Sequence, residues 1–314
     1  MTEMIIPCRD EGECVELVFD EISRVFSEIL PDHPWSVLYV DDGSTDDTLP
    51  KIKALAEKHG EDKVRYISLA RNFGKEAAVF AGLSNARGDY VCLMDADLQH
   101  PPALIPEMIQ AVESGEYDCA AARRVSRRGE PFIRSALSKG FYGIINFATG
   151  IGLVPGMTDF RLMRREVAKA VTSLQERERF LKGIYSWVGF KTKWIEYENV
   201  ERAAGSTKWS MGGLWSYAKS GYIAFATAPL RGVIYMGMVI VLISLIYAIY
   251  VYIQAKTGAR VWTDTLTIIL LLLFIGGTII TILGVIGEYL ARVYMEVKNR
   301  PIYIAKEKNF GEKS

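Results

Sequence analysis

Short apolar runs alternate with amphipathic, helix-like segments over roughly the first 225 residues. The apolar runs contain Met4–Ile6, Val37–Val40, Val64–Ile67, Tyr90–Met94 and Asp118–Ala121. The helix-like segments between them cover residues 13–30, 47–59, 75–86 and 103–114. Such alternation is typical of right-handed βαβ units, which build a mostly parallel sheet. The pattern therefore predicts an α/β, Rossmann-like domain.

Two later stretches carry no charge. No Asp, Glu, Lys or Arg lies between Arg231 and Lys256, and none lies between Asp264 and Glu288. Each stretch is long enough to cross a bilayer, which takes ~20 residues. We expect two transmembrane helices, about 232–254 and 265–288, joined as a hairpin within residues 231–291. A pair of buried core helices is the alternative, which the short polar loop between the runs disfavours.

The charges around these runs predict their orientation. Basic residues are more numerous on the side of the runs that both termini share than in the loop between them. The side shared by both termini has Lys219, Arg231, Arg292, Lys298, Arg300, Lys306 and Lys308, and the loop has Lys256 and Arg260. We therefore expect an inner-membrane protein with the domain before the two runs and both termini in the cytoplasm. The aromatic-rich segment 209–230 is expected to lie at the membrane interface, with ordinary core as the alternative. Residues 292–314 are expected to form a cytoplasmic tail.

Composition narrows the class of partner and the redox compartment. The 314 residues have a formal net charge of zero, which argues against a nucleic-acid partner attracted by bulk charge. The four cysteines show no C-x-x-C spacing and are expected to be reduced, packed thiols. The first residues have no basic region and no small-residue cleavage site, so no signal peptide is expected.

Acidic residues follow three of the predicted strands. Glu11 comes soon after the first strand, Asp41 and Asp42 after the second, and Asp95 and Asp97 after the fourth. The carboxyl ends of parallel strands meet at one edge of a sheet, and carboxylates gathered there repel unless a cation or hydrogen-bond donors lie among them. Oxygen ligands of this kind suit Mg²⁺ or Mn²⁺. Solvated turns and helix caps are the alternatives for single members of the group.

Two common nucleotide-binding motifs are missing from the sequence. No G-x-G-x-x-G follows the first predicted strand, and no G-x-x-x-x-G-K-[ST] loop is present. Dinucleotide-dependent oxidoreductases and P-loop NTPases are therefore poorly supported.

Several motifs along nearly the whole chain carry a family resemblance. They are Ile6-Pro7 with Asp10-Glu11, Val40–Ser44, Arg71–Glu76, Asp95–Pro102, Thr158–Met163, Gly205–Lys208 and Gly287–Tyr289. With them the chain resembles the family 2 inverting glycosyltransferases of the GT-A fold that charge a polyprenyl phosphate, such as dolichol-phosphate mannose synthases. Within the family, the chain looks most like bactoprenol glucosyltransferases of O-antigen (lipopolysaccharide) modification. This likeness lies in Asn72–Glu76, Ser186–Gly189 and the two C-terminal runs. Asp10 departs from the family, which usually has Asn there.

The resemblance implies a GT-A domain over residues 1–208 that contains a donor site. Its nucleoside pocket would contain Pro7, Glu11, Asp41 and Asp42. Asp95 would contact ribose or metal, and Asp97 with Gln99 would complete the protein ligands of Mg²⁺ or Mn²⁺. Lys75 would contact the nucleotide, with a solvated lysine at a helix start as the alternative. Ser206 and Lys208 would close over the donor diphosphate.

The resemblance also implies catalytic and acceptor residues. Asp159 would be the catalytic carboxylate beside Asp97, with a helix cap as its alternative. Arginines cluster before the amphipathic stretch 135–149, where an acceptor at the membrane surface would arrive. They are Arg123, Arg124, Arg127, Arg128 and Arg134. A solvated basic face is the ordinary explanation, and Arg134 is our candidate for binding the acceptor phosphate.

The implied reaction is inverting transfer of a sugar, best assigned as glucose, from a UDP-sugar to undecaprenyl or another polyprenyl phosphate. A homo-oligomer, such as a tetramer, is a further implication of the resemblance. The donor sugar is open to alternatives: GlcNAc, mannose from GDP-mannose, or an aminoarabinose derivative. A processive polysaccharide synthase is disfavoured because residues 175–180 do not match Gln-x-x-Arg-Trp. A non-catalytic membrane protein with a degenerate GT-A domain is disfavoured by the intact Asp95, Asp97 and Asp159.

Overall fold

The computed structural model describes residues 1–125, 146, 152–177, 179–198 and 265–311, together with single helical positions between 232 and 257. The chain forms two compact units. The first contains Met1–Ala224 and Pro301–Ser314, and the second contains Phe225–Arg300.

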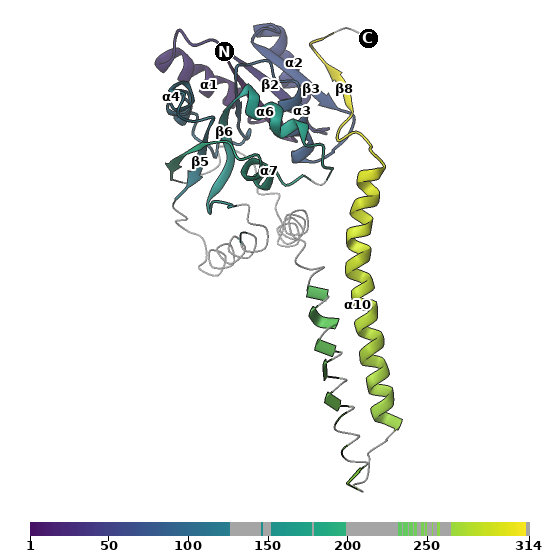
Figure 1. The fold of residues 1–314 in the computed structure, drawn as a ribbon. Helices are drawn as coiled ribbons and strands as arrows, with labels where there is room; N and C mark the ends of the chain where they lie inside the picture. The colour runs from purple at the N-terminus through teal and green to yellow at the C-terminus, as the bar shows by residue number, and fades with distance from the viewer. Residues whose placement is uncertain are drawn as a thin grey trace. The chain divides into compact units, whose positions relative to one another are not determined.

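One mixed sheet organises the described part of the first unit (Figure 1). Its strands are β1 (Thr2–Cys8), β2 (Trp35–Asp41), β3 (Val64–Leu69), β4 (Tyr90–Leu93), β5 (Cys119–Arg124), β6 (Met157–Arg164), β7 (Thr192–Tyr197) and β8 (Ala305–Lys308). Their order is β7-β5-β6-β4-β1-β2-β3-β8. The pairs β1–β2, β1–β4, β2–β3 and β5–β7 are parallel. β6 runs antiparallel to both β4 and β5, and β8 runs antiparallel to β3.

The helices of this unit cover both faces of the sheet. They are α1 (Val15–Ile29), α2 (Thr48–His59), α3 (Lys75–Ser84), the short 3₁₀ helix η1 (Pro102–Leu104), α4 (Ile105–Glu113), α6 (Arg165–Ser173) and α7 (Leu181–Trp187). α1 buries Val15, Val18, Phe19, Ile22 and Phe26, whose spacing of three and four residues places them on one face of the helix. That face packs with α2, α4 and the side chains of Met4 and Ile6 in the main core.

α3 packs closely against β1 and β2 at a glycine. A Cβ on Gly82 would lie 2.3 Å from Ile5 Cγ2 and 3.3 Å from Val40 Cγ2. Only a residue without a side chain fits between helix and strands at this point. Because Lys75 begins the same helix, this contact fixes where the lysine enters the site described below.

The predicted α/β architecture with a mostly parallel sheet is confirmed. Each of the five predicted strands and four predicted helices is present in the structure. The alternation of apolar and polar segments did not predict β6, β7 or β8. β6 is the most consequential of these, since it lies between β4 and β5 and carries Asp159.

The segment predicted as a cytoplasmic tail contributes β8 to the sheet edge in the first unit. Beyond β8, the side chain of Asn309 accepts a hydrogen bond from the Tyr66 N–H at 2.8 Å and donates one to the Val64 carbonyl at 3.0 Å. The ring of Phe310 lies 3.7 Å from the Arg65 guanidinium carbon. Residues 305–310 therefore cover the backbone of β3, which would otherwise be an open sheet edge.

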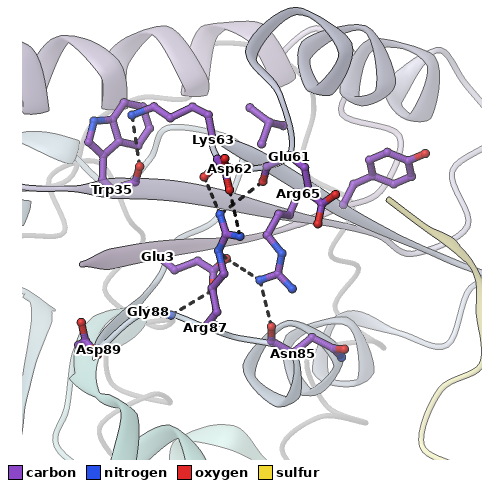
Figure 2. Close-up of polar contacts among 12 residues, drawn as sticks. Glu3, Trp35, Glu61, Asp62, Lys63, Arg65, Asn85, Arg87, Gly88 and Asp89 are labelled. Carbon is purple, nitrogen blue, oxygen red and sulfur yellow. Dashed lines mark hydrogen bonds and ion pairs between the residues drawn. The ribbon is translucent and has the colours of Figure 1, made fainter. Parts of the chain in front are cut away.

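A buried ion pair lies at the amino-terminal ends of the central strands (Figure 2). Glu3 has no exposed surface, and it accepts a hydrogen bond from Arg65 Nη1 at 2.8 Å. Its other oxygen accepts from the Arg87 N–H at 2.5 Å. Arg65 also donates to the Asn85 carbonyl at 3.2 Å. A buried carboxylate needs such partners, so the group joins β1, β3 and the turn before β4.

The second unit contains a long apolar helix, α10 (Thr265–Val297). Within it, Phe274–Val297 has a mean hydropathy of 1.7 and is long enough to cross a membrane. Large apolar side chains such as Ile280, Leu283 and Leu290 are exposed, as a lipid-facing surface requires. The described positions between 232 and 257 are helical, apart from a turn at Thr257, and expose Tyr235, Val239 and other apolar residues. Both observations fit the predicted hairpin, although α10 continues nine residues past the predicted end at 288.

Candidate active site

Three neighbouring strands bring their polar ends to one place. β1 pairs with β2 so that Cys8 lies opposite Asp41, and with β4 so that Ile5 lies opposite Leu93. The loops after these strands surround a cavity of about 310 Å³. It is lined by Pro7, Cys8, Arg9, Glu11, Asp42, Asn72, Gly74, Lys75, Ala78, Asp95, Ala96 and Asp97. Its volume lies at the lower end of the range typical of small-molecule sites, ~300–1,000 Å³.

Asp42 shapes one wall of this cavity through the turn that precedes α3. Its two carboxylate oxygens accept hydrogen bonds from the Phe73 N–H at 2.7 Å and the Gly74 N–H at 2.9 Å. Burial raises the pKa of Asp42, and these two hydrogen bonds oppose that shift. Gly43 makes the close approach possible, because a Cβ there would lie 2.6 Å from the Arg71 carbonyl carbon.

Asp41 lies below the cavity wall instead of facing the cavity. The side chain of Asp41 is 1% exposed and accepts hydrogen bonds from the Ser44 N–H at 3.0 Å and the Ser68 hydroxyl at 2.9 Å. These contacts stabilise the turn that presents Asp42. The adjacent acidic residues thus have different positions, which the sequence does not distinguish.

The loop after β1 is fixed to the loop after β2 by Asp10. Asp10 adopts a left-handed backbone conformation with φ of 50°, which Asn and Asp tolerate better than most residues. Its Oδ1 accepts a hydrogen bond from the Thr45 N–H at 2.8 Å, and its own N–H donates to the Ser44 hydroxyl at 2.9 Å. An asparagine could make the same two bonds, which explains how Asp replaces the Asn expected from the resemblance.

Lys75 joins two carboxylates that come from different strands. Its Nζ lies 2.7 Å from Asp95 Oδ1, after β4, and 3.1 Å from Asp159 Oδ2, on β6. Burial alone would lower the pKa of Lys75, but the carboxylates of Asp95 and Asp159 outweigh burial and raise it. Lys75 is therefore an ion-pair partner inside the site, and because it also lines the cavity its contact with the nucleotide stays a prediction.

The same cluster keeps Asp159 ionised. Burial would raise the pKa of Asp159, but the positive charges of Lys75, Lys182 and Arg161 outweigh burial and lower it. Glu76, the next residue along α3, behaves oppositely: burial and the nearby Asp159 raise its pKa to about 8. Glu76 accepts a hydrogen bond from the Leu181 N–H at 3.3 Å. At neutral pH the cluster therefore contains an ionised Asp159 beside a protonated Glu76.

The segment Asp95–Gln99 can supply oxygen ligands to a divalent cation. Asp95 and Asp97 both line the cavity, and Asp97 Oδ1 accepts a hydrogen bond from the Gln99 N–H at 3.1 Å. In the described part of the chain, no group of three or more His, Cys, Asp or Glu residues is arranged to hold a metal ion. Mg²⁺ is commonly bound through one or two carboxylates, with substrate phosphates and water completing the shell. The donor set present here fits that mode of binding.

Buried His100 lies beside this segment. It is 6% exposed, its ring stacks on Phe160 with centroids 5.4 Å apart, and its Nδ1 lies 4.0 Å from Asp95 Oδ2. Within the described residues its Nδ1 has no hydrogen-bond partner. Sequence spacing does not predict this contact, because His100 has no second histidine or cysteine at ligand spacing.

Most of the sequence-predicted donor residues meet in the structure. Pro7, Glu11, Asp42, Lys75, Asp95 and Asp97 line the cavity, and Asp159 reaches it through Lys75. Three predicted residues, Arg134, Ser206 and Lys208, lie outside the described residues, as do Arg127 and Arg128. Sequence reasoning did not single out Arg9, Asn72, Glu76 or His100. Of these, Asn72, Glu76 and His100 belong to stretches that carried the family resemblance.

Comparison with known families identifies the class of protein. A family model described as glycosyl transferase family 2 matches residues 4–172. The chain belongs to glycosyl transferase family 2. A second model, described as the GtrB C-terminal hairpin, matches residues 228–293. This family 2 glycosyltransferase therefore combines a GT-A catalytic domain with a hairpin that includes the apolar helix α10, as the resemblance implied.

Individual relatives match the chain from end to end. CsbB of Bacillus subtilis (strain 168) is 42% identical over 313 residues, which cover 100% of this chain and 93% of CsbB. The bactoprenol glucosyl transferase of Shigella phage SfII is 37% identical over 308 residues and 98% of both chains. Among solved structures, glucosyl-3-phosphoglycerate synthase from Mycobacterium tuberculosis in complex with Mn²⁺, UDP-glucose and phosphoglyceric acid is 17% identical. That match has a TM-score of 0.48 and covers 70% of this chain and 76% of the synthase.

Proposed function

We propose that this glycosyltransferase transfers glucose from UDP-glucose to a polyprenyl phosphate, with undecaprenyl phosphate (bactoprenol phosphate) as the acceptor. The products are polyprenyl-phosphate glucose and UDP. The observation that carries the proposal is the 37% identity to a bactoprenol glucosyl transferase over 98% of both chains, catalytic domain and hairpin included. The cavity at the strand ends supports it with carboxylates suited to a nucleoside diphosphate and a cation.

In the proposed donor complex, Pro7, Glu11 and Asp42 contact the nucleoside, with Asp41 supporting the turn beneath it. Carboxylates accept hydrogen bonds from ribose hydroxyls and from the uracil imide N–H. Asp95, Asp97 and Gln99 would hold Mg²⁺ or Mn²⁺, which would neutralise charge on the leaving diphosphate. Ser206 and Lys208 are proposed to contact that diphosphate.

Asp159 is proposed to orient the reacting groups instead of removing a proton. A phosphate monoester is already largely dianionic at pH 7, because its second pKa is about 6, so the acceptor needs little help from a base. An aspartate whose pKa is lowered by Lys75 is in any case a weak base. Positioning and charge compensation are then the main sources of rate enhancement. Arg134 is proposed to bind the acceptor phosphate.

A panel of nucleotide sugars tests the proposal. The purified full chain in detergent is given UDP-glucose, UDP-GlcNAc or GDP-mannose with undecaprenyl phosphate, and the lipid products are identified by mass spectrometry. We expect a hexose-phosphate lipid with UDP-glucose and none with Asp159→Asn. Transfer from another donor in preference to UDP-glucose would refute the assignment of the sugar and leave the lipid acceptor standing.

The membrane arrangement is part of the proposal: a two-helix hairpin whose loop is periplasmic and whose flanking segments are cytoplasmic. Cys8, Cys14, Cys92 and Cys119 are all buried, so background labelling of the folded protein should be low. A cysteine at Gly258 should react with an impermeant maleimide added to intact cells, and a cysteine at Ser314 should not. The reverse labelling pattern would refute this orientation.

A further inference from the structure

A second cavity, of about 210 Å³, lies beside β6 and α7 in the first unit. Val154, Met157, Phe190 and Trp194 provide apolar and aromatic walls, and Arg161 and Tyr185 provide polar groups. Among the described residues, no residue lines both this cavity and the donor cavity. The two cavities are therefore lined by different residues.

The charge on Arg161 is the unusual feature of this cavity. Arg161 is 2% exposed, and within residues 1–125, 152–177 and 179–198 no carboxylate lies within ion-pair distance of its guanidinium. Nη2 donates to the Thr158 carbonyl at 3.0 Å, and the guanidinium carbon lies 3.4 Å from the centre of the Tyr185 ring. Arginine is almost never fully buried unless it is paired.

Two hydrogen-bond donors at this place are also unsatisfied. Arg161 Nε and the hydroxyl of Tyr185, which is 7% exposed, have no hydrogen-bond partner in the part of the chain that the structure describes. Buried polar groups are paired in the great majority of cases, so the unpaired Tyr185 hydroxyl beside a buried arginine without an ion pair indicates a missing acceptor. Burial raises the pKa of Tyr185, so its hydroxyl stays protonated and can donate.

A buried cation and two donors favour an anion, and the surrounding walls favour an apolar group attached to it. Asp159 and Arg161 interact electrostatically at longer range. The Asp159 carboxylate is engaged by Lys75 at 3.1 Å, so it is not the direct ion-pair partner of Arg161. Asp159 and Arg161 are two residues apart on one face of β6, a distance of ~7 Å along the strand. An anion at Arg161 would thus lie close to the donor carboxylates.

We propose that this cavity binds a phosphate monoester on an apolar chain, namely the phosphate and first isoprene units of the acceptor lipid. Arg161 and Tyr185 bind the phosphate, and Met157, Phe190 and Trp194 contact the isoprene carbons. This inference rests on the proposed function for the identity of the lipid. It adds Arg161 and Tyr185, which are buried, to Arg134 as residues proposed to bind the acceptor phosphate.

The test is photo-labelling of the full chain in detergent with a diazirine-bearing farnesyl phosphate, followed by peptide mapping. We expect the label on peptides that contain Phe190 or Trp194. Tyr185→Phe keeps the ring that stacks on Arg161 and removes only the hydroxyl. It should raise the concentration for half-maximal labelling about tenfold, whereas the matched control Tyr66→Phe on β3 should not change it. Arg161→Lys keeps the charge but removes Nε and should also weaken labelling.

Competition identifies the chemistry of the occupant. Farnesyl phosphate should displace the photo-label at far lower concentration than inorganic phosphate or farnesol. Equal displacement by inorganic phosphate would show a free-phosphate site. Equal displacement by farnesol would show a purely apolar pocket. Labelling elsewhere, or unchanged labelling of Tyr185→Phe, would show that water satisfies these donors. Each of these results overturns the inference. Failure of the proposed function is distinguishable, because it would appear as absent glucose transfer by the wild type with labelling intact.

Discussion

Replacing Glu76 by glutamine should stabilise the protein, and increasingly so as the pH rises. Burial and the neighbouring Asp159 raise the pKa of Glu76 from its ordinary 4.5 to about 8. Glutamine has the same shape, keeps an oxygen for the Leu181 N–H, and cannot ionise. The variant therefore removes a titration and preserves the packing around it.

The direction follows from proton linkage. The folded state binds the proton of Glu76 more tightly than the unfolded state, so its stabilising contribution is fully present below about pH 4.5 and is lost as the pH rises through about 8. A difference from 4.5 to about 8 corresponds to at most ~5 kcal/mol. Glu76 is partly exposed, so solvent screening reduces this figure, and we expect ~1–3 kcal/mol at pH 8. For a domain of this size that is a rise in Tm of roughly 2–12 °C.

Thermal unfolding of the detergent-solubilised full chain, followed by near-ultraviolet circular dichroism between pH 5 and 9, measures this effect. The advantage of Glu76→Gln over the wild type should grow up to about pH 8 and then level off. Glu57→Gln, at an exposed position of α2, is the matched control and should show no such trend. A pH-independent advantage, or a wild type that gains stability relative to the variant at high pH, would refute the reasoning.

Three further predictions test other parts of the structure. Asp42→Asn should weaken UDP binding roughly tenfold by calorimetry, because one of two charge-assisted hydrogen bonds to the turn before α3 is lost; unchanged affinity would place the nucleotide elsewhere. Asn309→Ala should accelerate hydrogen exchange at the Tyr66 amide, which it shields, and unchanged exchange would contradict the edge-covering role. Glu3→Gln should lower stability by ~3–5 kcal/mol, because it leaves Arg65 buried without its anion. A loss below ~1 kcal/mol in denaturant unfolding would show that the pair is solvated.

The parts of the fold that sequence predicts well are those with one dominant signal. β1, β2, β3 and β4 are short apolar runs between amphipathic helices, and the strand-end acidic residues follow from their order. β6 lacks that signal, because its sequence places Asp159, Arg161 and Arg164 among apolar residues and so obscures a buried strand. β8 is a polar edge strand, Ala305–Lys308, whose partner is more than 200 residues away. Local pattern contains no information about such a pairing.

The site shows a similar division. Its membership was largely predictable, because the carboxyl ends of parallel strands converge whatever the details of their loops. The electrostatic state of its members was not. The contact of Lys75 with both Asp95 and Asp159 depends on an antiparallel strand that the pattern did not predict. The contrast between Asp159 and Glu76 depends on how many cations surround each carboxyl group, which only the three-dimensional arrangement determines.

The most direct test of the central claim is the stoichiometry of a single incubation. The purified full chain, UDP-glucose, Mg²⁺ or Mn²⁺ and undecaprenyl phosphate are combined, and UDP and lipid-linked hexose are quantified together. The account predicts equal amounts of both products, with little UDP when either the lipid or the divalent cation is omitted. UDP released at the same rate without the lipid, or no lipid-linked hexose when it is present, would contradict it.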